Sequence, residues 1–314
     1  MAYSSNFLGD HIVEVPTIHH KEVQKFDVQD FSMDDYYLDY SNYSVFQSPF
    51  RKFPYYTAAN IDGSLFKSIK RADVFSGGSD SWKKDERIPK DCQLGKELYS
   101  AEKSNFDKGH LTKREDVQWG ENTETARSAA ASTFYFTNAV PQVDRLNRGV
   151  WRRIEDYILH HEVVKQSLKI SMMTGPLLLD NDPDFVTDVN NTVVQIPTLF
   201  YKVIYYVRDN ELHRTGFLTS QKGLLEQRRI VKPVVRGEVP EAHDPFLDFK
   251  DAETYQVRVS FIEDIGKLKF AEAKEVFVES TPEELILDAV DVRSDEVITT
   301  RSRSRSQSRN NLKL

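Results

Sequence analysis

The alternation of apolar and polar positions predicts a chain with several strands and one long helix. Short apolar runs that end at turn residues are typical of strands in a sheet. Such runs cover residues 53–60, 106–111, 133–137, 168–173, 200–207 and 212–219. The last two flank Asp209-Asn210 and predict a hairpin with this pair at its tip, whereas Gly175-Pro176 is expected to end the strand at 168–173.

The clearest helix is expected at residues 144–164. With about 100° between successive residues, apolar side chains share one face that we expect to be buried: Leu146, Val150, Ile154, Tyr157 and Ile158. Arg148 and Arg152 fall on the opposite face, and Asn147 and Glu155 fall on the border between the two faces. A border position allows a polar side chain to be held by packing and still to reach a ligand.

Two shorter helices are also expected. The segment 123–132 is rich in alanine, which favours a helix. A second short helix is expected to begin with Ser260 as its N-cap and to end at Gly266.

Composition divides the chain into three parts. Residues 1–49 are expected to form an irregular N-terminal arm, because the acidic, tyrosine-rich stretch up to residue 48 has no clear period. Residues 50–278 carry the periodic segments and are expected to form one folded domain. Residues 279–314 become acidic and then repeat Arg-Ser at 301–309, and such a low-complexity tail cannot bury enough apolar surface to fold.

Charge and cysteine content narrow the classes of protein to consider. The net charge of −7 argues against a protein that coats nucleic acid through its global field, so any such contact must come from a local basic patch. The single cysteine, Cys92, excludes an internal disulfide framework and a cysteine-based zinc cluster. Neither a signal peptide nor a membrane span is recognised, so we expect no membrane contact and a location in the cytoplasm or export by a signal-independent route.

Several polar residues between positions 107 and 155 suit the cleavage of a phosphodiester. Such cleavage needs an activated water and stabilisation of charge on the phosphate and the leaving oxygen. His110 closes the run 107–110 (Asp-Lys-Gly-His), and histidine is the usual general base near neutral pH. Asn147 offers an amide oxygen to a hard cation such as Mg²⁺. Because about 12 Å of helix rise separates it from Glu155, Asn147 as direct ligand and Glu155 as holder of a metal-bound water is the simpler arrangement.

These residues resemble the non-specific DNA/RNA endonucleases of the ββα-metal superfamily, the group that includes mitochondrial endonuclease G. The family hallmark Asp-Arg-Gly-His reads Asp107-Lys108-Gly109-His110 here. The family continues with Ser/Thr-Asn, Pro-Gln, Leu-Asn, a tryptophan and, four positions later, an acidic residue. The matching positions here are Thr137-Asn138, Pro141-Gln142, Leu146-Asn147, Trp151 and Glu155. In all, the similarity spans residues 50–270.

The resemblance implies an α+β fold, with a central antiparallel sheet flanked by helices and a ββα-metal motif at the site. It implies a Mg²⁺-dependent endonuclease, with Mn²⁺ as the alternative cation, that hydrolyses DNA and RNA with low sequence specificity and leaves a 5′-phosphate and a 3′-hydroxyl. His110 would be the general base, Asn147 the direct metal ligand and Glu155 the holder of a metal-bound water. Asn138 would lie beside the site and support its geometry.

Two departures from the family concern the phosphate contacts. Lys108 replaces the arginine of the hallmark. We still expect it to be one of the catalytic residues, although a lysine lacks the planar fork of a guanidinium. The family often has an arginine two positions before the upstream tryptophan, where this chain has Asp80. Arg87 or Arg71 could substitute for it. The side chains expected to bind the substrate are Arg148, Arg152 and Arg87.

Two other functions remain open at this point. An inactive relative could bind nucleic acid through the helix arginines and the Arg-Ser tail, and the same chemistry could serve a phosphodiesterase for small nucleotides. A homodimer, as in many relatives, and an inhibitor or regulatory partner are further expectations. Alternatively, the acidic residues 30–45 could restrain the enzyme by covering the basic face of the helix at 144–164.

Overall fold

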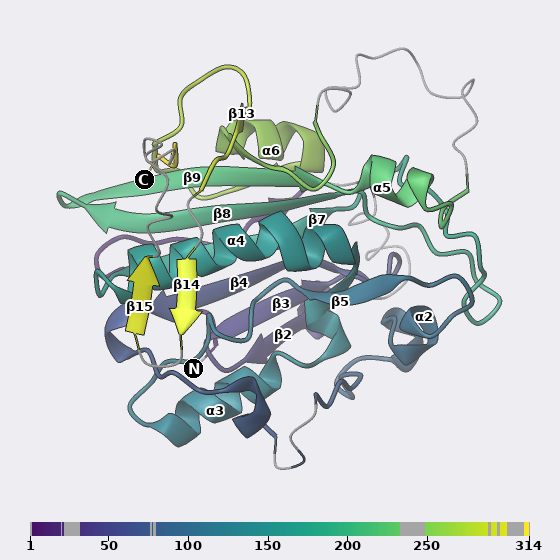
Figure 1. Cartoon of the computed structure of the whole chain (residues 1–314), viewed down its shortest axis with the longest axis horizontal. Helices are drawn as coiled ribbons and strands as arrows, with labels where there is room; N and C mark the ends of the chain where they lie inside the picture. The colour runs from purple at the N-terminus through teal and green to yellow at the C-terminus, as the bar shows by residue number, and fades with distance from the viewer. Residues whose placement is uncertain are drawn as a thin grey trace.

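The centre of the fold is a nine-stranded sheet. The structure is a computed structural model that describes residues 2–19, 21, 32–75, 77, 80–232, 249–287, 290–293, 296–299 and 311–313. The strands follow the order β13-β10-β9-β8-β7-β4-β3-β2, and β12 pairs with β9 in parallel. All other pairings along this path are antiparallel, as the predicted α+β fold requires. Figure 1 shows the strands stacked from β9 to β2.

The strands of the main sheet are β2 (Tyr37–Tyr40), β3 (Tyr43–Gln47), β4 (Pro54–Asp62), β7 (Lys169–Leu177), β8 (Leu199–Arg208), β9 (Glu211–Ser220), β10 (Thr254–Val257), β12 (Lys274–Glu275) and β13 (Glu283–Glu284). Three separate pairs join β1 (Thr17–Ile18) to β11 (Leu268–Lys269), β5 (Phe106–His110) to β6 (Ala139–Val143), and β14 (Val290–Arg293) to β15 (Glu296–Thr299).

The helices are α2 (Lys96–Tyr99), α3 (Thr123–Ser132), α4 (Trp151–Asp156), α5 (Lys222–Gln227) and α6 (Val259–Gly266), with the π-helical segments η6 (Leu146–Val150) and η7 (Tyr157–Val164) on either side of α4. Short 3₁₀ turns are η1 (Met33–Tyr36), η2 (Gly63–Leu65), η3 (Arg71–Asp73), η4 (Lys90–Cys92) and η5 (Phe136–Asn138). Among the described helices, none combines the length and the apolar character that crossing a bilayer requires.

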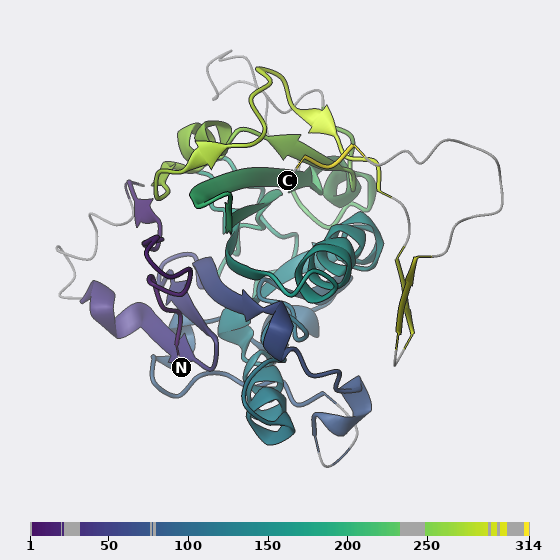
Figure 2. The same ribbon diagram turned by 90° about the vertical axis from the view of Figure 1, so that its left-hand side faces the viewer.

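Two helices cover opposite faces of the sheet. Lys202 of β8 contacts α4, and it lies opposite Phe217 of β9 in the sheet. Gly216, the residue before Phe217, faces Ile262 of α6. Neighbouring residues of a strand point to opposite faces, so α4 and α6 lie on different sides. Figure 2 shows this arrangement, with α4 viewed nearly end-on. Burial on both faces explains why β8 reads as an almost continuous apolar run.

The predicted hairpin and the helix at 123–132 are confirmed. Asp209 and Asn210 form the tip between β8 and β9 with φ of 51° and 60°, a left-handed pair that these two residue types tolerate. The predicted strand at 53–60 is also confirmed, although β4 runs to Asp62. Its last residues are buried like the rest, and the 3₁₀ turn η2 follows directly from Gly63.

Two strand predictions are wrong. Residues 133–137 form no strand: Phe136–Asn138 is a 3₁₀ turn, and the strand β6 starts only at Ala139. The aromatic side chains of this segment instead pack beneath a cleft described below. The strand at 168–173 does not end at Gly175-Pro176, because β7 continues to Leu177. Its partner β4 pairs with it only up to Thr174, so Pro176 lies where one edge of β7 is no longer paired.

The prediction of an irregular arm is wrong for residues 37–47, which form β2 and β3 of the main sheet. All five residues of β3 are buried, so the alternation that would reveal a strand with one exposed face is missing.

The predicted cap of the last helix is also wrong. Arg258 is the N-cap of α6, and the left-handed Lys267 follows Gly266 at its end.

The tail at 279–314 packs more than its composition suggests. β13 pairs with β10, and Asn311 Nδ2 donates to Glu283 Oε1 and to the Glu284 carbonyl over 3.0 and 2.9 Å. The prediction of an unfolded tail is therefore wrong for these residues, whereas the repeat at 301–309 lies outside the described residues. The three-part division of the chain stays a prediction.

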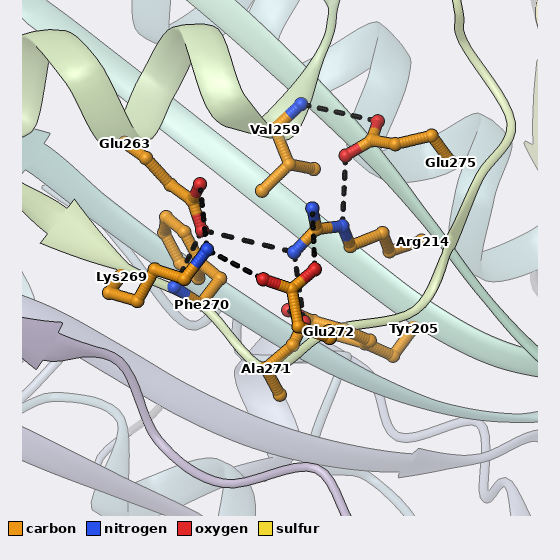
Figure 3. Close-up of polar contacts among 9 residues, drawn as sticks. All are labelled: Tyr205, Arg214, Val259, Glu263, Lys269, Phe270, Ala271, Glu272 and Glu275. Atoms are coloured by element: carbon orange, nitrogen blue, oxygen red, sulfur yellow. Dashed lines mark hydrogen bonds and ion pairs between the residues drawn. The ribbon is translucent and has the colours of Figure 1, made fainter.

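A buried arginine ties the C-terminal segment to the sheet (Figure 3). The side chain of Arg214, on β9, is 6% exposed, and its Nε lies 2.8 Å from Glu275 Oε1. Its Nη1 donates to the Ala271 carbonyl over 2.9 Å, and Glu263 and Glu272 lie 3.8 and 3.5 Å from the guanidinium. A buried charge needs such compensation, so this network holds α6 and β12 against β9, away from the α4 face.

Candidate active site

A ββα unit forms the floor of the candidate site. β5 pairs with β6 from Phe106↔Val143 to His110↔Ala139, and the helix η6-α4-η7 follows. Gly109 is required in β5, because a Cβ atom there would lie 2.2 Å from Oε1 of the buried Gln142 side chain. A cleft with a volume of about 590 Å³ opens beside this unit. It is lined by Arg71, Asp80, Trp82, Asp107, Lys108, His110, Lys113, Arg114, Glu115, Asn147, Arg148, Arg152 and Glu155.

The structure brings six of the eight predicted site residues to this cleft: Lys108, His110, Asn147, Arg148, Arg152 and Glu155. The helix that carries four of them is less regular than predicted. Gly149 interrupts it with φ of −98° and ψ of −113°, and π-helical turns lie on both sides of α4. Widened turns of this kind are frequent at functional sites. The predicted apolar face is buried at Leu146, Ile154, Tyr157 and Ile158.

His110 is held by aromatic rings and is neutral at pH 7. Its ring lies 4.6 Å from that of Trp82 and 5.0 Å, edge to face, from that of Phe134. Burial, with a smaller effect of the Arg71 charge, lowers the pKa of the imidazole from 6.5 to about 3. Within the part of the chain that the structure describes, its buried Nε2 has no hydrogen-bond partner. In the tautomer with its proton on Nδ1, this nitrogen can accept a hydrogen bond.

Asn147 is oriented by a carboxylate of β5. Its Nδ2 donates to Asp107 Oδ2 over 3.0 Å, and the same carboxylate accepts from Arg148 Nε and Nη2 over 2.7 and 2.5 Å. With the amide nitrogen engaged, the carbonyl oxygen Oδ1 is the atom of Asn147 that can bind a cation. Asp107 therefore fixes both the rotamer of this amide and the position of the first helical turn.

A buried lysine lies behind Glu155. Lys202 is fully buried, and its Nζ forms an ion pair with Glu155 Oε1 at 3.0 Å. The ammonium also lies 3.2 Å from Thr174 Oγ1 and 4.9 Å from the centre of the Trp151 ring. Lys202 is not among the residues predicted for the site, although a lysine inside the apolar run of β8 is a signal that could have revealed it.

Asn138 lies below the cleft and not in it. It is fully buried; its Oδ1 accepts from Thr112 N over 2.9 Å, and its Nδ2 donates to the carbonyls of Thr112 and Thr133 over 2.9 and 3.0 Å. These contacts connect the loop after His110 to the segment before β6. The geometry suits the supporting place that the resemblance implies for it.

Arg87 is the predicted substrate-binding residue that the structure does not bring to the site. Its guanidinium binds both oxygens of Asp85, donates to the Asp39 carbonyl and stacks over Tyr40, and Arg87 is absent from the described lining of the cleft. Arg71, the other arginine considered, does line the cleft. Its guanidinium is paired with Asp80.

The acidic segment at 30–45 does not face the helix arginines in its described part. Residues 33–36 form η1, and residues 37–40 and 43–45 belong to β2 and β3, at one end of the sheet. The carboxylates that contact Arg148 and Arg152 are Asp107 and Asp156. The hypothesis that the arm covers the basic helix face is therefore wrong for these residues.

A second group of metal-ligating side chains adjoins the cleft. Donor atoms of Glu115, Asp156 and His160 lie within 4.8 Å of one another. The Lys113 ammonium, however, contacts both carboxylates, at 2.7 Å from Glu115 Oε2 and even closer to Asp156 Oδ1. An ammonium ion thus already supplies the positive charge that these carboxylates require.

Comparison with known proteins gives a consistent assignment. The family model described as DNA/RNA non-specific endonuclease matches residues 21–277. The chain is 35% identical over 194 residues to the uncharacterized protein y4fB of Sinorhizobium fredii (strain NBRC 101917 / NGR234), covering 59% of this chain and 27% of that protein. It is 32% identical over 136 residues to human mitochondrial endonuclease G, covering 41% of this chain and 39% of that protein.

Among solved structures, the chain is similar to one from an EndoG/EndoGI complex, with a TM-score of 0.52 and 20% sequence identity. The similarity covers 81% of this chain and 93% of that one. At this identity, the similarity concerns the fold. The curated relatives above are matched over 27% and 39% of their own length, well under two thirds.

Proposed function

The chain belongs to the family of DNA/RNA non-specific endonucleases, and from this premise we propose that it hydrolyses phosphodiester bonds in DNA and RNA with low sequence specificity. The observation that carries the proposal is His110. Its buried Nε2 has no hydrogen-bond partner among the described residues, and the histidine lines the same cleft as Asn147 and several cationic side chains. A neutral imidazole beside cations is the arrangement that hydrolysis of a polyanion needs.

In the proposed reaction, His110 Nε2 removes a proton from the attacking water. The water oxygen forms the new bond to phosphorus, the bond to the 3′ oxygen breaks, and a proton from solvent completes the leaving hydroxyl. The products are a 5′-phosphate and a 3′-hydroxyl. Trp82 and Phe134 keep the imidazole in place while it carries the proton.

The donor set of the cleft fits a hard divalent cation, which we propose to be Mg²⁺, with Mn²⁺ as the alternative. Asn147 Oδ1 would bind it directly, and Glu155 would hold one of its waters; both supply the oxygen ligands that Mg²⁺ prefers. A bound cation supplies neutralisation of charge on the phosphate and the leaving oxygen. Two further side chains fix these two residues: Lys202 forms an ion pair with the Glu155 carboxylate, and Asp107 accepts a hydrogen bond from the Asn147 amide.

The substrate would approach along the helix that carries Arg148 and Arg152. Their side chains are 71% and 65% exposed, so both can turn toward phosphates. Lys108 lies 5.9 Å from the centre of the Trp82 ring, next to His110. These contacts form the local basic patch that a chain of net charge −7 needs to bind nucleic acid.

Removal of divalent cations is expected to abolish the nicking of supercoiled plasmid, and added Mg²⁺ is expected to restore it. Asn147→Ala should raise the Mg²⁺ concentration for half-maximal rate by at least about 10-fold, because loss of a direct ligand should cost no less than loss of a side chain that only supports one. Asn105→Ala, which removes an exposed amide just before β5, serves as the control. Undiminished nicking in EDTA would contradict the role of the metal.

The same assay separates the two other functions considered. Binding of plasmid without nicking at any Mg²⁺ or Mn²⁺ concentration would identify an inactive nucleic-acid-binding relative. Faster hydrolysis of a dinucleotide ester than of plasmid would identify a small-nucleotide phosphodiesterase.

The pH dependence of cleavage is expected to reflect the lowered pKa of His110. A general base accepts a proton only in its neutral form. We therefore expect kcat/KM to stay constant from pH 7 to well below pH 6.5 and to fall only at more acidic pH. Below pH 6.5 the unfolded chain binds a proton that folded His110 does not, so acidification also lowers stability. Circular dichroism at each pH must therefore show a folded chain; a midpoint at or above 6.5 would be inconsistent with this environment of His110.

A further inference from the structure

Arg71 and Asp80 face each other in the cleft. Arg71 Nε donates to Asp80 Oδ1 over 2.9 Å, and Nη2 donates to the other oxygen, so the pair is bidentate. The Arg71 side chain is 59% exposed and that of Asp80 is 30% exposed. The guanidinium also lies over the Phe134 ring, 5.6 Å from its centre, and His110 contacts the same ring edge to face at 5.0 Å. Arg71 is therefore held close to the proposed general base.

Two other cations of the cleft have little exposed surface, and a third is engaged beside the proposed metal ligand. Lys113 and Arg114 have side chains only 13% exposed; Lys113 binds two carboxylates, and Arg114 binds Glu115 and the Ile69 carbonyl. Arg148 shares Asp107 with the proposed metal ligand Asn147. Arg71 is thus an exposed guanidinium close to His110, and it forms an ion pair with Asp80 of the cleft wall.

A carboxylate and a phosphodiester compete for the same guanidinium geometry. Both offer two oxygen atoms to the planar fork of an arginine. Asp80 uses Nε and Nη2 together, the two donors that a bidentate phosphate would require. Its negative charge also lies within the electrostatic reach of His110 and Lys108, so it repels a phosphate from that part of the cleft.

We propose that Arg71 binds a substrate phosphate and that Asp80 occupies Arg71 until nucleic acid displaces it. This proposal rests on the proposed function. Asp80 is then an internal competitor that weakens binding of the polyanion. Productive binding requires exchange of the Asp80 carboxylate for a phosphodiester on Arg71. The chain would therefore select for substrates that present several phosphates at once, since the other contacts must supply the free energy of this exchange.

The test is binding of a labelled oligonucleotide in EDTA, measured by fluorescence anisotropy over a range of salt concentrations. Asp80→Asn is expected to lower Kd by about 3-fold to 10-fold, the size of one exposed ion pair. The slope of log K against log salt should change little, because Arg71 contacts a phosphate in both complexes, whereas Arg71→Gln should make it shallower by about 0.7 to 0.9. Arg71→Gln should raise Kd, and in that background Asp80→Asn should have little effect.

The matched control is Asp264→Asn, which makes the same change of net charge on an exposed residue of α6, on the opposite side of the sheet. An Asp80→Asn variant that binds no more tightly than the unaltered chain would overturn the proposal. Equal tightening with and without Arg71 would also overturn it, because general repulsion would then be the cause. If the unaltered chain neither binds nor nicks nucleic acid, the proposed function itself fails, a result distinct from normal cleavage with an inert Asp80.

Discussion

Replacing His110 with alanine is expected to lower the rate of plasmid cleavage by about 100-fold to 10,000-fold, the usual contribution of a general base. Binding should be nearly unchanged, because the cationic side chains of the cleft remain. The imidazole is half-buried against Trp82 and Phe134, and Nε2 has no other partner among the described residues. Its loss therefore removes the proton acceptor and breaks no hydrogen bond of this nitrogen.

The measurement for His110→Ala combines a single-turnover cleavage assay with oligonucleotide binding in EDTA. His11→Ala, on the N-terminal segment, controls for the loss of an imidazole elsewhere. A variant that still turns over at a similar rate would refute the assignment of the base. A variant that loses binding as well would show that His110 acts on the substrate phosphate and not on water.

Replacing Lys202 with methionine is expected to lower the free energy of unfolding by about 3–5 kcal/mol, the cost of leaving a buried charge without its partner. Glu155 would keep a carboxylate that is 10% exposed and has lost its counter-charge at 3.0 Å. The nearby buried Asp116, whose pKa is already raised to about 7 by burial, would lose part of the positive field that favours its ionised form.

A double variant distinguishes this explanation from a simple packing defect. Glu155→Gln in the Lys202→Met background should recover much of the lost stability, because the uncompensated charge is then gone, but it should not recover cleavage. The Lys169 side chain is 52% exposed, and its ammonium lies 3.5 Å from Asp62 Oδ2, so Lys169→Met should cost no more than about 1 kcal/mol. The readout is urea denaturation; a double variant no more stable than Lys202→Met would exclude the charge-pair explanation.

The elements that could be predicted are those set by neighbouring residues. The hairpin tip at Asp209-Asn210 and the alanine-rich helix at 123–132 follow from local turn chemistry and helix propensity. The predictions that were wrong, at residues 37–47 and 133–137, concern stretches whose secondary structure depends on what covers them. A fully buried strand such as β3 and a layer of aromatic rings such as that at 134–136 can have similar apolar composition.

The order of residues in the chain by itself determined the chemistry on offer: a histidine after Gly109, an amide and a carboxylate on one helix, and arginines around them. These residues lie near one another along the chain, so a strand pair and the helix after it suffice to bring them together. Only the tertiary structure decided which other side chains contact these residues. Asp85 binds Arg87 while Arg71 reaches the cleft, and Lys202 arrives behind Glu155 from a distant strand. The physical reason is that ion pairs and burial depend on distances in space, which no local pattern encodes.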